Sequence, residues 1–438
     1  MTLTADEVKA ITAKILSRSR ADSCSVWIGG GDETNLRFAG NSATTNGRKR
    51  HLSVTIESNY GACSGSARAT GLDEAPLAAA QARSEEIARM VPANPEFMPP
   101  LGPQEYEPTR VFDAATASIP AARLADAAEA VIIRARQHHL DSGGFASVAH
   151  SFSAHANSSG LFAYTPTTHG ALSATCRNTA GTWSGWAAAS ATAFADIDAA
   201  GIGGRAVAKA AQEAVPVDLD PGSYTVILEP AAVAEMLSYL MWSVNARQAD
   251  EGRSFLSQKG GGNRLGEQFF DAGVTITSDP GDPLCPDEPV GYEGVPRRRR
   301  VWVEDGAVQT MTASRFWAQK QGYEPVPAPA CITMSGGTVS IDDMIRNTRR
   351  GILVTRFWYT NLVDPRTLLV TGLTRDGNFY IENGRIAGPA RNLRFNESIL
   401  AMLKNIVAMG PAERESGGNA VPPLLVKEFN FSSRSDGI

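Results

Sequence analysis

The stretch SYTVILEPAAVAEMLSYLMW, Ser223 to Trp242, predicts a strand that leads directly into a helix. Its first part, SYTVILEP, is typical of a strand, and from Val233 onward apolar residues recur at the spacing of one helical face. A helix that follows a strand end is a common place for catalytic side chains, yet this one offers methionine and leucine. The helix is therefore either a plain core element or the counterpart of a catalytic helix that has lost its catalytic side chains. Its predicted apolar stripe consists of Val233, Met236, Leu237, Leu240, Met241 and Val244.

The composition of the chain indicates a soluble globular protein of two or three domains. Of its 438 residues 43% are hydrophobic and 20% are charged, and the chain is too long for one ordinary core. No apolar run reaches the roughly 18 residues that a membrane span needs. Residues 1–20 lack the apolar centre of a signal peptide and predict an amphipathic helix.

The cysteines indicate the cellular compartment, and the net charge limits the classes of partner that the protein could bind. The cysteines are scattered, odd in number and never in a C-x-x-C pair, which favours reduced thiols in a cytoplasm. A net charge of −5 and a pI near 5.8 argue against a general nucleic-acid binder. The run Arg297–Arg300 precedes a strand-like segment and predicts a charged strand edge, with contact to a phosphate or an acidic partner as the alternative. The five cysteines are Cys24, Cys63, Cys176, Cys285 and Cys331.

Two shifts in composition divide the chain into segments 1–90, 114–213 and 221–438. Prolines between 91 and 108 forbid continuous helix or sheet, and AVPVDLDPG at 214–222 marks the second break. Each of the first two segments predicts a helix, antiparallel strands and a closing helix. The third is richer in strands, so the predicted fold class is α+β, with two helix–antiparallel strands–helix segments followed by a larger strand-rich C-terminal domain.

The third segment predicts an antiparallel sheet with few covering helices. Helices are expected at 231–246, near 340–351 and near 396–406. Hairpin turns are expected at RDGN, 375–378, and at ENGR, 382–385, because Asp-Gly and Asn-Gly suit tight turns between strands.

Histidine placement limits the chemistry of the third segment. All six histidines lie at or before His169, so neither a histidine-ligated zinc site nor a complete Ser–His–Asp triad fits within residues 221–438. His150 and His155 are five apart on a predicted strand, and the odd spacing turns them to opposite faces. The two are therefore predicted to be ordinary strand residues rather than metal ligands.

Three short motifs imitate known sites, and each has a simpler interpretation. GACSG, 61–65, resembles a nucleophile elbow around Cys63, but no helix follows at once, which favours a small buried thiol. GIGGRA, 201–206, matches a dinucleotide fingerprint without a preceding buried strand. KGGGNRLG, 259–266, lacks the lysine and hydroxyl residue of a phosphate loop and predicts a mobile glycine loop beside the methionine-bearing helix.

The region from Pro296 onward resembles the TldD/PmbA (TldE) family. The resemblance is carried by EGVPRRRRVWVEDGAV, by RRGILVTRFWYTNLVDPRTLLVTGLTRDGNFYIENGRIAGPARNLRF and by the closing VPPLLVKEFNFSS. It covers nearly the whole chain and is strongest over 290–396. In this family TldD-type subunits carry an HExxxH helix and a C-terminal cysteine that bind a catalytic metal, whereas PmbA/TldE-type subunits lack them and pair with the first kind.

Laid on this chain, the resemblance puts the two histidines of the motif at Met236 and Met241 and its glutamate at Leu237. The C-terminal cysteine would fall within 414–418, and no cysteine follows Cys331. A thioether cannot replace imidazole on a hydrolytic zinc, and leucine cannot deprotonate water. The resemblance therefore implies a metal-free PmbA/TldE-type subunit with no catalytic residue and no cofactor of its own.

The resemblance implies a non-catalytic subunit of a hollow cytoplasmic metalloprotease that acts on peptides or unfolded chains. This subunit would close the chamber of the protease and hold the substrate. Its partner would be a TldD-like HExxxH-bearing subunit, which would hold a zinc-type metal. Sheet edges would hold the substrate, with Met236, Met241 and Phe255 as candidate apolar contacts and core packing as the alternative for the methionines. The alternatives are a metal-independent peptide-binding homodimer, a cysteine hydrolase that uses Cys63, and a DNA- or gyrase-binding role.

Overall fold

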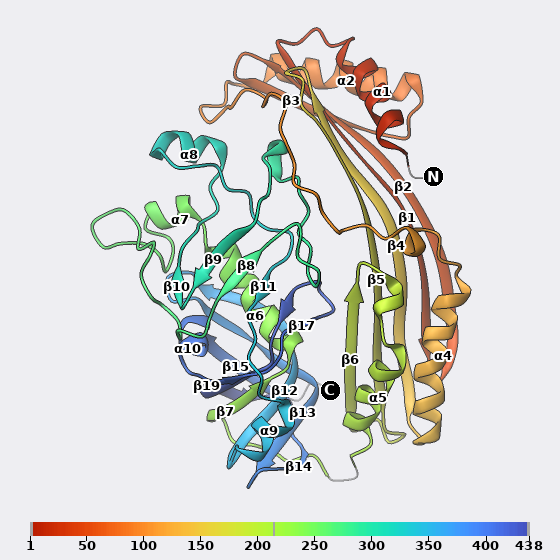
Figure 1. The fold of residues 1–438 in the computed structure, drawn as a ribbon, viewed down its shortest axis with the longest axis vertical. Helices are drawn as coiled ribbons and strands as arrows, with labels where there is room; N and C mark the ends of the chain where they lie inside the picture. The colour runs from red at the N-terminus through yellow and green to blue at the C-terminus, as the bar shows by residue number, and fades with distance from the viewer. Residues whose placement is uncertain (1–2, 213–214, 436–438) are drawn as a thin grey trace.

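The computed structural model describes residues 3–212 and 215–435 (Figure 1). The first two segments each contain a helix, antiparallel strands and a closing helix, as predicted, and each has three strands. The first consists of α1 (Ala5–Leu16), β1 (Ser23–Ala39), β2 (Ser42–Tyr60), β3 (Cys63–Thr70) and α2 (Glu74–Met90). The second consists of α3 (Ala114–Ala117), α4 (Ala122–Gln137), β4 (Asp141–Asn157), β5 (Phe162–Arg177), β6 (Ser184–Ala191), the short η1 (Phe194–Asp196) and α5 (Ala199–Ala210).

The two segments join in one long six-stranded sheet. Its strand order is β3-β2-β1-β4-β5-β6, and β1 and β4 meet in the middle as an antiparallel pair from Ser25–Asn157 to Phe38–Gly144. The boundary between segments 1–90 and 114–213 therefore divides the sequence and leaves the sheet intact. The outer limits 1, 213 and 438 lie outside the described residues.

Alternation along β1 gives the long sheet two different faces. Val26 and Ile28 pack against α1 and α2 at one end, and Leu36 and Phe38 pack with α4 and α5 at the other. In Figure 1 these two helix pairs lie far apart along the sheet. Asp32 lies on the same face between the two helix-covered cores, and Trp27 is on the opposite face.

The C-terminal domain is strand-rich, as predicted. Its helices are α6 (Pro230–Ser243), α7 (Ala246–Asp250), α8 (Arg315–Gln321), α9 (Ile341–Arg346) and α10 (Ile399–Lys404), with the short η2 (Tyr292–Gly294). One sheet has the order β10-β9-β8-β11-β18-β17 and contains β8 (Ile276–Ser278), β9 (Arg300–Glu304), β10 (Ala307–Val308), β11 (Thr333–Met334), β17 (Glu413–Arg414) and β18 (Ala420–Val421).

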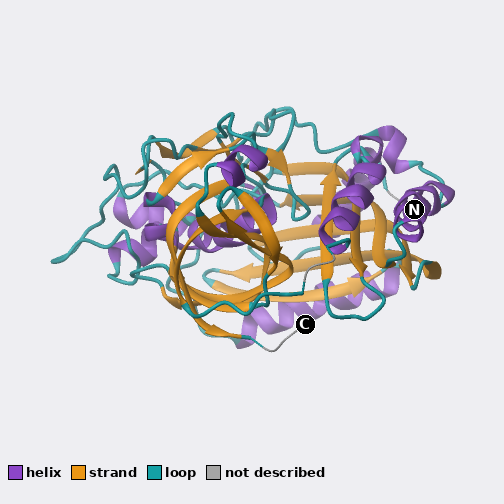
Figure 2. Cartoon of the chain, turned by 90° about the horizontal axis from the view of Figure 1, so that it is seen from below, coloured by secondary structure: helices purple, strands orange, loops and turns teal. Residues whose placement is uncertain are grey.

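The second sheet of this domain closes into a barrel. Its order is β12-β7-β19-β15-β13-β14, and β13 also pairs with β12, which returns the ring to its start. The ring of strands is visible in Figure 2. Its strands are β7 (Gly222–Leu228), β12 (Arg350–Asp364), β13 (Leu369–Glu382), β14 (Arg385–Pro389), β15 (Leu393–Ser398) and β19 (Leu424–Arg434), with β16 (Ile406–Met409) attached to β19.

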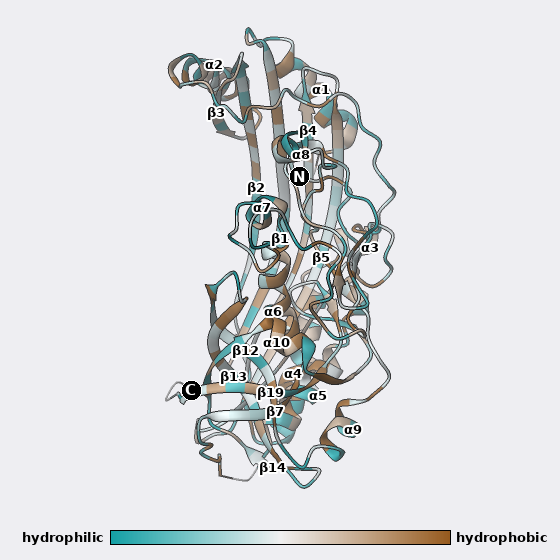
Figure 3. Ribbon diagram, turned by 90° about the vertical axis from the view of Figure 1, so that its left-hand side faces the viewer, coloured by the Kyte–Doolittle hydropathy of each residue, from teal (hydrophilic) through white to brown (hydrophobic). Residues whose placement is uncertain are grey.

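A cluster of aromatic rings contributes to the core of the C-terminal domain. The Phe357 ring lies 4.4 Å from that of Phe395 and 5.7 Å from that of Phe429, measured between centroids, and Phe431 extends the cluster. The same core takes in α6, which is coloured largely as hydrophobic in Figure 3. The barrel and α6 are thus held by one continuous apolar core.

One of the two predicted hairpin turns is wrong. Residues 375–378 lie within β13, where Asp376 and Gly377 take φ values of 51° and 124° and form a bulge opposite β12. The bulge turns Asp376 to Arg356, so a buried ion pair takes the place of a chain reversal. The other turn, 382–385, is confirmed: Glu382 pairs with Arg385, and Asn383 and Gly384 have positive φ.

The proline-rich connection contains neither helix nor strand from 91 to 113 and ties the long sheet to the C-terminal domain. Tyr106 donates a hydrogen bond to the carbonyl of Gly294 at 2.8 Å. Glu96 accepts two hydrogen bonds from Arg247, each at 2.8 Å. Among the described residues, no helix is long and apolar enough to cross a membrane.

Candidate functional site

Helix α6 has a buried face and a face that borders a groove. On the buried face Met236 is 0% exposed and Leu237 is 1% exposed, both within the core of the C-terminal domain. On the other face Glu235, Ser238 and Tyr239 line the groove. The predicted apolar stripe is therefore the core side of the helix, and its polar side faces outward.

The groove measures about 700 Å³ and collects residues from four distant parts of the sequence. Strand β6 of the long sheet supplies Trp186, and β12 supplies the run from Arg356 to Thr360. The loop that contains Glu415 closes another side. The groove therefore lies where the long sheet meets the C-terminal domain.

A chain of hydrogen bonds links α6 to β12 at the groove. The hydroxyl of Thr360 donates to the carboxylate of Glu235, and the hydroxyl of Tyr239 donates to Thr360 at 3.0 Å. Glu235 is thereby held on the groove side of the helix.

A buried ion pair supports the aromatic side of the groove. Asp376, whose side chain is 6% exposed, accepts from Arg356 and from the hydroxyl of Ser184 at 2.9 Å. The Arg356 guanidinium lies 4.7 Å from the ring centroid of Trp186 and 5.3 Å from that of Trp358. The arginine is thus held between two indoles, as in cation–π contacts.

The loop 415–419 is ordered by a single carboxylate. Glu415 accepts hydrogen bonds from the amides of Gly417 and Asn419, the latter at 3.0 Å, and Ser190 of the long sheet donates to its carbonyl at 2.9 Å. Burial raises the pKa of Glu415, although these two amide donors oppose the rise. This loop overlaps the stretch 414–418 that the family resemblance matched to a metal-binding cysteine.

In the described part of the chain, one edge of β12 lacks a strand partner beside the groove, although α6 packs against β12 there. Strand β12 pairs with β13 along its length but with β7 only through Gly351–Val354, so within the described residues 355–364 have no strand partner on that side. Trp358 is 38% exposed and Tyr359 is 74% exposed. An unpaired edge with exposed aromatic side chains is suited to receive another extended chain.

The residues predicted to contact a substrate are placed differently. Met236 and Phe255 are buried, and Phe255 packs edge-on against Phe269 with a centroid distance of 5.2 Å. A substrate contact requires an accessible side chain, so core packing accounts for both residues. Met241 is partly buried against the same core and does not line the groove.

The side chains at the motif positions do not fit a hydrolytic metal. Met236 and Leu237 are enclosed in the core, and methionine and leucine offer neither imidazole nor carboxylate to a zinc ion. Among residues 3–212 and 215–435 no group of three or more His, Cys, Asp or Glu side chains is arranged to hold a metal ion.

The remaining sequence motifs have structural roles. Cys63 begins β3 rather than sitting at a strand-to-helix turn, and the glycines of 201–206 lie inside α5, where Gly203 packs against Val131 of α4. Residues 259–266 form a loop in which three successive glycines have positive φ. All five cysteines are free thiols.

The arginine run at 297–300 is balanced by carboxylates. Arg300 forms a 2.6 Å ion pair at the start of β9, and Arg297 also donates to three backbone carbonyls. This arrangement agrees with a charged strand edge. The carboxylate partners, in order, are Glu288, Glu107, Asp279 and Glu324.

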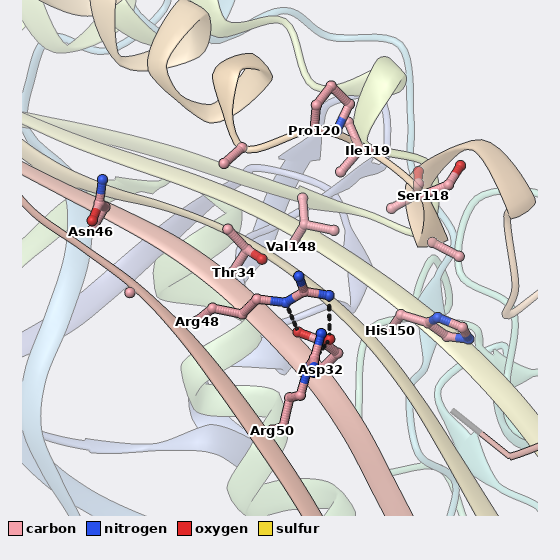
Figure 4. A pocket seen from close by; sticks show the side chains of 14 residues that line it. Asp32, Thr34, Asn46, Arg48, Arg50, Ser118, Ile119, Pro120, Val148 and His150 are labelled. Carbon is pink, nitrogen blue, oxygen red and sulfur yellow. Dashed lines mark hydrogen bonds and ion pairs between the residues drawn. The ribbon is translucent and has the colours of Figure 1, made fainter. Parts of the chain in front are cut away.

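A second cavity, of about 610 Å³, lies on the helix-covered face of the long sheet. Figure 4 shows Asp32 between Arg48 and Arg50, with His150 to one side. The two guanidinium groups hold the pKa of Asp32 near 2, the Arg48 hydrogen bonds being the largest cause. His150 and His155 lie on opposite faces of β4, as predicted, since they oppose Asp32 and Trp27 of β1 respectively.

Sequence reasoning missed most of the groove. Glu235, Trp186 and Tyr359 come from separate elements, and no spacing pattern connects them. One local signal was present: the polar positions of α6 between the apolar ones mark the face that leaves the core. The aromatic pair at 358–359 also interrupts the alternation of β12.

Three comparisons with known proteins agree with this architecture. The profile of the PmbA/TldA metallopeptidase C-terminal domain matches residues 221–433. A protein of Methanothermobacter thermautotrophicus described as a metalloprotease is 26% identical over 204 residues, a match that spans 43% of this chain and 43% of that relative's length.

Solved structures of similar fold cover almost the whole chain. TldE from Thermococcus kodakarensis matches with a TM-score of 0.86 at 17% identity, over 98% of this chain and all of that one. A Thermotoga maritima protein described as a modulator of a DNA gyrase matches with a TM-score of 0.85 at 18% identity, over 97% and 100%. The profile match shows that residues 221–433 form a PmbA/TldA metallopeptidase C-terminal domain, and the whole chain shares the fold of these solved structures.

Proposed function

We propose that this chain is a non-catalytic subunit of a TldD/TldE-type cytoplasmic metalloprotease. In this proposal it holds peptides or unfolded chains and closes the chamber, while a TldD-like HExxxH-bearing subunit supplies the metal and the general base. The observation that carries the proposal is the groove beside the unpaired edge of β12.

The groove suits an extended peptide of unspecified sequence. An added strand along 355–364 would form main-chain hydrogen bonds, which do not depend on side chains. Trp358 and Tyr359 would contact apolar groups of that strand, since both are exposed at the groove. Glu235 offers the peptide a carboxylate at the α6 side.

The chemistry of α6 supports a holding role rather than a cleaving one. Its buried face carries Met236 and Leu237, and its groove face carries Glu235 without any histidine. A lone glutamate can act as a base but cannot bind and polarise a water through a metal. Cleavage would therefore be the task of the partner.

Co-expression tests the partnership. The chain is produced with its nearest HExxxH-bearing relative, and the mixture is analysed by size exclusion, metal analysis and digestion of an unstructured peptide. We expect one complex whose zinc-type metal belongs to the relative and whose activity exceeds that of the relative alone. If the two chains neither co-purify nor alter the digestion, the subunit proposal is wrong.

A matched pair of tyrosine variants tests the groove. Tyr359→Ala should weaken capture of a labelled neutral peptide by about tenfold, since an exposed aromatic contact contributes roughly 1–1.5 kcal/mol. Tyr292→Ala, at a tyrosine that is 80% exposed and outside the groove, should leave capture unchanged. Peptides with N-methylated backbone should bind less well if the edge of β12 receives them.

The same unpaired edge favours one alternative, a metal-independent peptide-binding homodimer. Two copies of β12 could pair edge to edge, because a C2 interface needs a self-complementary element. Sedimentation of the chain alone distinguishes the two. A stable dimer that captures peptide and ignores the HExxxH-bearing relative would favour the homodimer.

A further inference from the structure

A small cavity on the other face of the long sheet has its own chemistry. It measures about 220 Å³ and lies between β1, β4 and β5 on one side and the loop 290–293 of the C-terminal domain on the other. Its walls include the rings of Trp27, His155 and Tyr292 and the carboxylate-bearing Glu293. It shares no lining residue with the groove at α6.

His155 is the unexplained member of this cavity. The residue is 6% exposed, and neither ring nitrogen has a hydrogen-bond partner among the described residues. A buried polar group normally has a partner, because an unsatisfied one costs roughly 1–3 kcal/mol. Burial lowers the pKa of this imidazole to about 4, so it is neutral near pH 7, with one nitrogen free to accept.

Aromatic rings surround the imidazole. Trp27 stacks on His155 with a centroid distance of 4.6 Å and an interplanar angle of 12°. Tyr292 is 80% exposed, although a large aromatic side chain gains from burial. An indole and a phenol at one cavity provide the electron-rich faces that attract cations.

Two carboxylates place negative charge at or near the cavity. Glu293 lines it and forms a 3.3 Å ion pair with Arg315. Glu57 of β2 projects on the same sheet face as Trp27, one diagonal step away, since Thr55 is directly opposite Trp27. No lysine or arginine of the described chain forms a salt bridge with Glu57, so one of the two negative charges has no counter-charge.

We propose that this cavity binds an organic cation, either a primary ammonium or a guanidinium group. The cation would lie against the rings of Trp27 and Tyr292, beside the buried imidazole of His155, and would balance the charge of the nearby Glu57. An anion would be repelled by Glu293 and the nearby Glu57, and a purely apolar ligand would leave the charge of Glu57 without a counter-charge. The inference is independent of the proposed subunit role.

Histidine-selective NMR of the full chain tests the proposal with three probes. N-acetyl-lysine amide and putrescine carry an ammonium group, and N-acetyl-norleucine amide is the uncharged counterpart of the first. We expect a saturable shift of the His155 ring signal, assigned by its loss in His155→Gln, with the two cations and none with the norleucine compound. An equal shift with the norleucine compound, or no shift with any probe, would overturn the proposal.

Two variants locate the contacts without disturbing the core. Glu57→Gln keeps the shape of the side chain and removes its charge, and Tyr292→Ala alters an exposed ring; each should weaken binding of the cations by about tenfold. Tyr359→Ala, in the groove, should leave cation binding unchanged. Unaltered affinity in both Glu57→Gln and Tyr292→Ala contradicts the proposal.

The relative affinities distinguish the two sources of the cation. Tighter binding of N-acetyl-lysine amide assigns the site to basic side chains of a polypeptide. Tighter binding of putrescine assigns it to free amines. Both outcomes support a cation site, and neither depends on whether Tyr359→Ala changes the capture of neutral peptides, so the two proposals can fail separately.

Discussion

His155 illustrates how burial decides the behaviour of a single titratable side chain. Its lowered folded-state pKa means that the unfolded chain takes up the proton more readily, so protonation favours unfolding. The stability that depends on the neutral ring is complete above the ordinary value of 6.5 and declines as the pH falls toward 4. Carboxylates with raised pKa, such as Glu415, act in the opposite direction.

We expect His155 to lower the stability of the protein in mild acid. Between pH 7 and pH 4.5 its contribution should fall by about 2 kcal/mol. The measurement is urea unfolding of the parent chain and of His155→Gln at both pH values. His150 and His169 also have lowered pKa values and remain in both proteins, so their effects cancel. An equal loss of stability in both proteins would contradict the expectation.

Single residues were predictable where a local pattern fixed their environment. Burial of Met236 and Leu237 followed from helical spacing, and the opposite faces of His150 and His155 followed from strand alternation. The burial of Phe255 could not be predicted, because the core of the C-terminal domain that encloses it is built from residues between 219 and 431. Contacts between distant segments have no local signal.

Helix α6 shows at the scale of an element how one sequence serves two surfaces. Leu237 lies in the core, whereas Ser238, the next residue, borders the groove. Leu237→Ala should lower the unfolding free energy by about 2–4 kcal/mol, and Ser238→Ala should change it by less than about 0.5 kcal/mol. Thermal or urea unfolding of the two variants provides the comparison.

A substitution that introduces the glutamate of the HExxxH motif at position 237 extends the same test. Leu237→Glu should be more destabilising than Leu237→Ala, because an unpaired carboxylate would be buried. A Leu237→Glu variant as stable as the parent chain would show that this position is not enclosed.

The bulge in β13 is the element that sequence reasoning misread. Asp376 and Gly377 have the composition of a hairpin turn, and they do adopt positive φ. Strand β13 continues because its pairing with β12 resumes at Asn378 and Val354, and Asp376 gains Arg356 as a partner. Turn chemistry is local, whereas the choice between a turn and a bulge depends on the neighbouring strand.

A pair of glycine substitutions tests the strain at this bulge. An added Cβ at Gly377 would lie 2.7 Å from the Thr355 hydroxyl oxygen at a φ of 124°, whereas Gly260 has a φ of 97° and open space around it. Gly377→Ala should therefore cost about 2–3 kcal/mol and Gly260→Ala about 1 kcal/mol. Urea unfolding measures both, and equal costs would argue against a tight bulge.

At the scale of the whole molecule, the sequence predicted the order of elements but not their assembly. The helix–strands–helix pattern of each segment was visible in the sequence. The pairing of β1 with β4, which joins the two segments in one sheet, was not visible, because pairing between distant strands has no signature in a single sequence. Closure of the barrel through β12 and β13 was likewise hidden. The groove arises from this assembly, since Trp186 belongs to the long sheet and Glu235 to α6.

Trp183 packs between the long sheet and the C-terminal domain, and from this position we predict how the chain unfolds. It precedes β6 of the long sheet, yet its ring lies 5.4 Å from that of Phe379 and belongs to a core cluster otherwise made of residues from the C-terminal domain. Its indole donates to the carbonyl of Lys209 at 2.8 Å. Because a shared core couples domains more strongly than surface contacts, the parent chain should unfold in a single calorimetric transition.

Trp183→Leu should separate that transition into two. The substitution removes the edge-on contact with Phe379 and leaves a cavity that costs about 3 kcal/mol, while the cores on the helix-covered face of the long sheet and in the barrel stay intact. Trp242→Leu is the matched control, since Trp242 is 63% exposed at the end of α6. If Trp183→Leu only lowers the temperature of one undivided transition, the long sheet and the C-terminal domain are coupled chiefly by their other contacts, such as Glu96 with Arg247 and Ser184 with Asp376.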